Sequence, residues 1–108
     1  MKNDILSRLG EVLEQRKQAS PKDSYTAKLF AEAPDSILKK IVEEAIEVVI
    51  ASKSGKNDDI IHEIADLWFH VLVLLKHHNL DANDILEELE GRFGLSGIEE
   101  KASRKKPS

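Results

Sequence analysis

Cysteine is absent from the 108 residues of this chain. Disulfide scaffolds, thiolate zinc sites and cysteine nucleophiles are therefore excluded, and the absence is consistent with a reducing, cytoplasmic setting. Long apolar runs are also lacking, since the longest, residues 71–75, ends at Lys76 and is far shorter than the ~20 residues that cross a bilayer. The first residues contain no apolar signal region. We therefore expect neither a membrane span nor a secretory signal.

An excess of basic charge is missing as well. The chain has 16 lysine and arginine residues against 20 acidic residues, a formal net charge of −4, which disfavours a general nucleic-acid-binding protein. The last segment, 101–108, is the exception, because it contains Lys101, Arg104 and two further lysines but no acid. An acidic body with a basic tail suits a ligand that carries both cations and phosphates, although a solvated tail is the more common reason for such a run.

Apolar residues recur at helical spacing along most of the chain, and neither strand alternation nor an internal repeat is present. Proline and glycine positions then suggest where helices end. The expected helices are a first one from about residue 5 to the stretch before Pro21, a short helical turn or loop capped by Ser24 (24–30), two long helices (35–54 and 57–78) separated by Gly55, and a shorter helix (81–92). The predicted fold class is all-α, with four to five helices in a single domain, residues 1–108.

The two long helices carry more apolar residues than one neighbouring helix can cover. Ile46 and Ile50 widen the apolar arc of helix 35–54, and Phe69 and Val73 lie away from the main stripe of helix 57–78. A second copy of the chain is an economical partner for these residues, so we expect a helical bundle completed by a homodimer. Coverage by the first and last helices is the alternative.

Acidic residues occur at three-residue spacing on both long helices, which places each pair on one helix face. The pairs are Glu44 with Glu47 and Glu63 with Asp66. Antiparallel packing across the short connection brings them to similar heights, because Glu47 lies eight residues before Gly55 and Glu63 eight residues after it. Converging carboxylates repel one another unless a cation neutralises them, and Mg²⁺ and Mn²⁺ prefer oxygen ligands. The paired pattern favours a metal site over acids that only solvate two amphipathic helices.

Three further polar residues lie close to these pairs in the sequence. Lys40 precedes Glu44 by one helical turn. His70 follows Asp66 by four residues on the same side of its helix, so it either orients that carboxylate, contacts a ligand or is a bystander. His62 is expected to point elsewhere.

The string Glu43-Glu44-Ala45-Ile46-Glu47, followed after fifteen residues by Glu63-Ile64-Ala65-Asp66, resembles the EExxE…ExxD signature of the MazG-like all-α nucleoside triphosphate pyrophosphatases. Segments 24–30, 37–40, 63–70 and 94–104 are, in addition, similar to the stand-alone phosphoribosyl-ATP pyrophosphatase family. That resemblance implies hydrolysis of a nucleotide substrate, phosphoribosyl-ATP, to phosphoribosyl-AMP and pyrophosphate, the second step of histidine biosynthesis. It also implies a magnesium-dependent, cytoplasmic homodimer.

On this resemblance, four carboxylates hold Mg²⁺, for which Mn²⁺ can substitute: Glu44, Glu47, Glu63 and Asp66. Either Glu43 or Glu47 orients or deprotonates the attacking water, and the sequence leaves that choice open.

Substrate contacts are expected from six residues. Lys40, Lys101 and Arg104 would contact phosphates, and Ser24 and Thr26 would donate hydroxyl hydrogen bonds to them. Tyr25 either lines the nucleotide pocket or packs inside the protein.

Two other functions are compatible with the acidic helices. A house-cleaning (d)NTP pyrophosphatase would use the same carboxylates on dUTP or a damaged nucleotide, but it has no need for the family-like segment 24–30 or the basic tail. A non-enzymatic helical interaction module would carry the acids only for solubility. Acids placed by chance would not also bring the matching segments, so we rank this alternative last.

Overall fold

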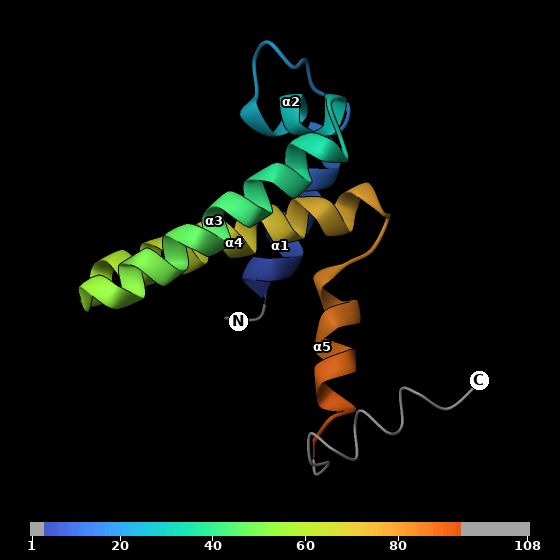
Figure 1. Ribbon diagram of the computed structural model, residues 1–108. Coiled ribbons are helices and arrows are strands. Elements are labelled where there is room, and N and C mark those ends of the chain that lie inside the picture. Colours follow the sequence, from blue (N-terminus) through green and yellow to red (C-terminus); the bar gives the residue numbers. More distant parts are fainter. Residues whose placement is uncertain (1–3, 94–108) are drawn as a thin grey trace.

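The computed structural model describes residues 4–93, and this part of the chain contains helices and no strand. The helices are α1 (Asp4–Arg16), α2 (Tyr25–Ala31), α3 (Asp35–Ser54), α4 (Asn57–His77) and α5 (Ala82–Glu90). α3 and α4 form a long antiparallel hairpin, α1 and α2 pack near one end of it, and α5 extends away from it (Figure 1). The prediction of an all-α fold is confirmed. The basic tail, with Lys101 and Arg104, lies outside the described residues.

Local interactions explain where the helices begin and end. The Ser24 hydroxyl accepts a hydrogen bond from the Ala27 N–H at 3.1 Å, so segment 24–30 starts a capped helix and not a loop. Gly55 closes α3 with a φ of 76°, the left-handed conformation that glycine adopts without strain. α1 ends earlier than expected, at Arg16, because the Lys17, Gln18 and Ala19 N–H groups bond to carbonyls only three residues back.

The core lies at the end of the hairpin where α1 and α2 pack. Four buried side chains, one from each of α1 to α4, contact one another there: Leu13, Leu29, Ile37 and Val73. Ile37 and Val73 each lie eighteen residues from Gly55, before and after it, so the two helices of the hairpin are packed in register. This register determines which polar residues can meet farther along the hairpin.

The rest of the hairpin and α5 leave many apolar side chains exposed. On α3 these are Leu38, Val42, Ile46, Val49 and Ile50; on α4 they are Ile61 and Trp68; on α5 they are Ile85, Leu86 and Leu89. A groove of about 390 Å³ runs between α1, α4 and α5, and Trp68 and Leu89 line it. A single copy of the described chain therefore leaves these faces uncovered.

None of the five helices within residues 4–93 combines the length and the apolarity that a membrane span requires.

Candidate active site

The hairpin register brings the predicted polar residues to matched heights. Lys40 and His70 lie fifteen residues before and after Gly55, and Glu44 and Asp66 lie eleven residues before and after it. Because α3 and α4 are packed in register at Ile37 and Val73, these pairs follow the core pair along the hairpin at intervals of three to four residues. The site thus begins where the well-packed end of the hairpin stops.

Lys40 is the positive charge of the site. Its ammonium nitrogen lies 3.4 Å from a Glu44 carboxylate oxygen and 3.6 Å from a Glu43 carboxylate oxygen. Partial burial by itself would lower the pKa of Lys40, but the Tyr25 hydroxyl, the bond to Glu44 and the Glu43 carboxylate outweigh burial and raise it. Lys40 therefore keeps its charge at neutral pH, beside a Glu44 side chain that is only 12% exposed.

Tyr25 is the first residue of α2, and its hydroxyl interacts electrostatically with Lys40. Burial of its hydroxyl contributes most to a raised pKa; Lys40 opposes this effect, and the carboxylates of Glu44, Glu43 and Asp66 add to it. The hydroxyl forms a hydrogen bond of 2.8 Å with Nε2 of His70, while the ring of Tyr25 remains half exposed.

The second carboxylate pair lies on α4. Ligand atoms of His62, Glu63 and Asp66 all lie within 4.8 Å of one another, and Nε2 of His62 is 3.4 Å from an Asp66 carboxylate oxygen. Within residues 4–93 this is the one group of three or more metal-ligating side chains that lie so close, and neither Glu44 nor Glu47 belongs to it. The two carboxylates are oxygen donors of the kind that Mg²⁺ prefers, so the donor set fits that ion.

His62 was missed by the sequence reasoning, which placed it on another side of the helix. The signal that identifies it is its spacing of four residues from Asp66, a distance at which side chains of one helix meet.

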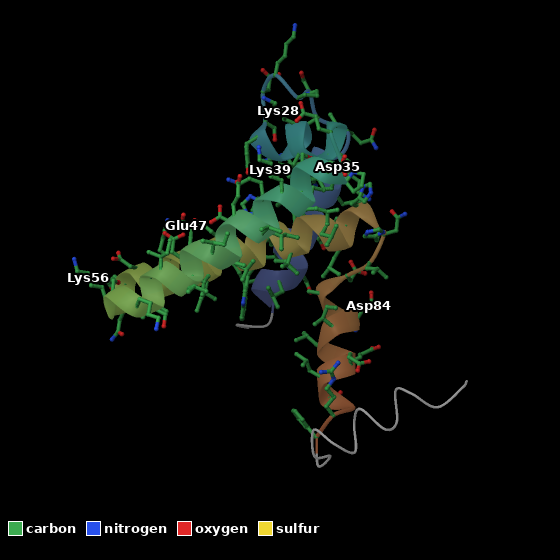
Figure 2. The ribbon with its side chains drawn as sticks, viewed as in Figure 1. Lys28, Asp35, Lys39, Glu47, Lys56 and Asp84 are labelled. Carbon is green, nitrogen blue, oxygen red and sulfur yellow. The ribbon has the colours of Figure 1, made fainter. Side chains whose placement is uncertain are left out.

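The remaining predicted residues are placed as follows. Ser24 caps α2 through its hydroxyl oxygen, and Thr26 is buried at 9% exposure. Glu43 and Glu47 are exposed on α3, and Figure 2 labels Glu47 partway along the hairpin. The structure therefore joins Lys40 to Glu43 and Glu44, Glu63 to Asp66, and the Tyr25 hydroxyl to His70.

Comparison with known proteins identifies the family. The sequence profile described as phosphoribosyl-ATP pyrophosphohydrolase matches residues 6–93. The chain is 58% identical over 102 residues to phosphoribosyl-ATP pyrophosphatase of Nitrosospira multiformis, covering 94% of this chain and 84% of that protein. It is also 58% identical to the enzyme of that name from Methylococcus capsulatus (94% and 97% covered) and 49% identical to the one from Neisseria meningitidis serogroup B (96% and 97% covered). The chain therefore belongs to the phosphoribosyl-ATP pyrophosphohydrolase family.

Proposed function

We propose that this protein is the hydrolase that converts phosphoribosyl-ATP and water into phosphoribosyl-AMP and pyrophosphate, the second step of histidine biosynthesis. The observation that carries the proposal is the set of carboxylates along the α3–α4 hairpin, with Lys40 paired to Glu44 and Tyr25 hydrogen-bonded to His70, in a chain 58% identical to a phosphoribosyl-ATP pyrophosphatase. A biosynthetic hydrolase without cysteine fits the cytoplasm. We also propose that residues 1–108 form one domain with a basic tail, residues 101–108.

The carboxylates suit magnesium. Glu63 and Asp66 supply adjacent oxygen donors on α4, and Glu44 and Glu47 supply two more from α3, with Mn²⁺ as a substitute. When bound, the ion neutralises charge that builds up on the triphosphate oxygens. The half-buried Lys40 provides one fixed positive charge beside these acids, which limits their mutual repulsion in the free protein.

Residues of α3 activate the attacking water and bind the phosphates. Glu43 or Glu47, both exposed on the α3 side of the site, orients or deprotonates the attacking water. The water oxygen bonds to phosphorus, the α–β phosphoanhydride bond breaks, and pyrophosphate leaves. Lys40 contacts the phosphates from the hairpin.

Residues outside the hairpin complete the phosphate contacts. The tail residues Lys101 and Arg104 add positive charge, and arginine can bind two phosphate oxygens at once. Ser24 and Thr26 flank Tyr25 at the start of α2, and we assign hydrogen bonds from their hydroxyl groups to the phosphates.

We further propose that the active form is a homodimer. Exposed apolar side chains lie on α3, α4 and α5, and Trp68, which is 60% exposed, lines the groove between α1, α4 and α5. Large exposed apolar patches are unusual on a monomer and mark interaction surfaces. A second copy is the partner that the chain itself provides, and sedimentation velocity would show it as a dimer at micromolar concentration. A stable monomer there would refute this part of the proposal.

Pyrophosphate release from phosphoribosyl-ATP, dUTP and ATP, measured in parallel with magnesium and with EDTA, tests the function. We expect magnesium-dependent release from phosphoribosyl-ATP alone. Release from dUTP instead would retain the acidic site but replace the substrate. If a folded protein releases pyrophosphate from none of the three, the acids only solvate the helices.

A further inference from the structure

His70 is the one buried titratable side chain among residues 4–93. It is 5% exposed, and both of its ring nitrogens are hydrogen-bonded: Nδ1 lies 2.8 Å from the backbone carbonyl oxygen of Asp66, and Nε2 lies 2.8 Å from the Tyr25 hydroxyl. Tyr25 and Phe69 contact the ring edge-to-face, with ring centroids 5.9 Å and 5.2 Å away. The imidazole is therefore fixed in position and in rotation.

The carbonyl partner determines where the ring proton lies. A carbonyl oxygen can only accept a hydrogen bond, so Nδ1 must carry a proton and donate it to Asp66. A neutral ring with its proton on Nδ1 has an unprotonated Nε2, which can only accept. The hydrogen bond at Nε2 is then donated by the Tyr25 hydroxyl.

This arrangement limits what Tyr25 can do at the site. Its single hydroxyl hydrogen is committed to His70, so only the lone pairs of the oxygen remain available. An oxygen that can only accept cannot bond to a phosphate oxygen, which also only accepts. Its partner must be a donor. The hydroxyl is held beside the turn of α4 that carries Asp66, because the same imidazole is hydrogen-bonded to both the Tyr25 hydroxyl and the Asp66 carbonyl, and a water held by the carboxylates there would be such a donor.

We propose that His70 is a positioning residue that turns the Tyr25 hydroxyl into an acceptor-only group at the carboxylate site, where its oxygen accepts a hydrogen bond from water bound among the carboxylates. His70 thereby ties α2 to the helical turn that carries Asp66. The inference rests on the proposed function, and it assigns Tyr25 to the bound water and not to the phosphates.

Two substitutions of His70 separate its two hydrogen bonds. The amide of asparagine lies about where Nδ1 does, so His70→Asn keeps a donor for the Asp66 carbonyl and removes the acceptor for Tyr25. The amide of glutamine reaches about as far as Nε2, so His70→Gln keeps an acceptor for Tyr25 and loses the bond to Asp66. The same substitutions at His78, an exposed residue just after α4, are matched controls.

The experiment measures kcat and KM for phosphoribosyl-ATP with magnesium, with circular dichroism as the test of folding. We expect Tyr25→Phe and His70→Asn each to lower kcat about tenfold with little change in KM, the loss of one hydrogen bond in the transition state. The double variant Tyr25→Phe/His70→Asn should be no slower than either single variant. His70→Gln should retain most of the activity.

Several results would overturn the inference. Multiplying effects in the double variant, or His70→Gln as slow as His70→Asn, would reduce His70 to a packing residue. Nitrogen-15 spectra of the ring provide a readout that is independent of turnover. An unprotonated Nε2 whose signal moves in Tyr25→Phe supports the inference, and a protonated Nε2 contradicts it even in an active enzyme. A wild-type protein that does not hydrolyse phosphoribosyl-ATP would instead refute the proposed function and, with it, the catalytic part of this inference.

Discussion

The two ends of the α3–α4 hairpin are built differently. At the end near α1 and α2, Ile37 and Val73 are fully buried and contact side chains from four helices. Toward Gly55, Ala51 is the one buried side chain of α3, and the neighbouring Ile46 and Ile50 are more than half exposed. The polar site lies between these two ends. The described part of one chain thus completes the end that fixes the register of the site and leaves the other end exposed, where we propose that a second copy packs.

The largest expected effect tests the packed end. Ile37→Ala should lower the free energy of unfolding by ~2–5 kcal/mol, because the Ile37 side chain is fully buried and its removal opens a cavity in the core. Denaturant unfolding followed by circular dichroism measures it. Ile46→Ala is the matched substitution at the exposed end. Its effect should depend on protein concentration, since Ile46 is covered by the partner in the proposed dimer, whereas that of Ile37→Ala should not. A concentration-independent loss at Ile46 would contradict the comparison.

A charge placed on the exposed apolar surface tests the proposed homodimer. Trp68→Glu should weaken the dimer by a factor on the order of a hundred, since buried tryptophans contribute strongly to interfaces. Analytical ultracentrifugation over a dilution series gives the dissociation constant. Val12→Glu on α1, also at an exposed apolar position, is the control. If Val12→Glu dissociates the dimer and Trp68→Glu does not, the interface lies on the α1 face.

Lys40 lies between the two ends, paired with Glu43 and Glu44. Lys40→Gln should raise KM for phosphoribosyl-ATP about tenfold, because it removes the charge-assisted phosphate contact that we propose for Lys40. The neighbouring Lys39, labelled in Figure 2, is exposed, and Lys39→Gln should leave KM unchanged. Steady-state kinetics at fixed ionic strength measures KM for both variants. Equal effects of the two substitutions would mean that only net charge matters.

The smallest expected effect concerns the tight connection of the hairpin. Gly55→Ala should cost about 1 kcal/mol of stability, because alanine is strained at a positive φ although its methyl group would meet no neighbour within 4 Å. Gly91→Ala is the control, since Gly91 has a φ of −65° and only ordinary contacts. Thermal unfolding of both variants measures the difference, and equal melting temperatures would contradict it.

Local chemistry explains which features could be predicted from the sequence. The Ser24 cap and Gly55 act within a few residues, so the bounds of α3 and the start of α2 follow from the residue pattern. The matched heights of Glu44 and Asp66 follow from the short connection between two long helices.

Other features depend on how the helices pack against one another. Tyr25 and His70 are 45 residues apart, and their hydrogen bond exists only because α2 docks on α4. The direction of α5 and the exposure of Trp68 likewise depend on contacts that no local pattern specifies. The contact between His62 and Asp66, in contrast, could have been predicted from the sequence, because residues four apart on a helix lie on the same face.

Magnesium-dependent pyrophosphate release from phosphoribosyl-ATP, compared between the wild type, Asp66→Asn and Asp59→Asn, tests the central claim most directly. Asp66 belongs to the carboxylate site, whereas Asp59 is an exposed acid in the first turn of α4. Asp66→Asn should reduce kcat/KM by a factor on the order of a hundred or more, and Asp59→Asn should leave it unchanged. A folded Asp66→Asn variant with wild-type turnover would show that the reaction takes place elsewhere.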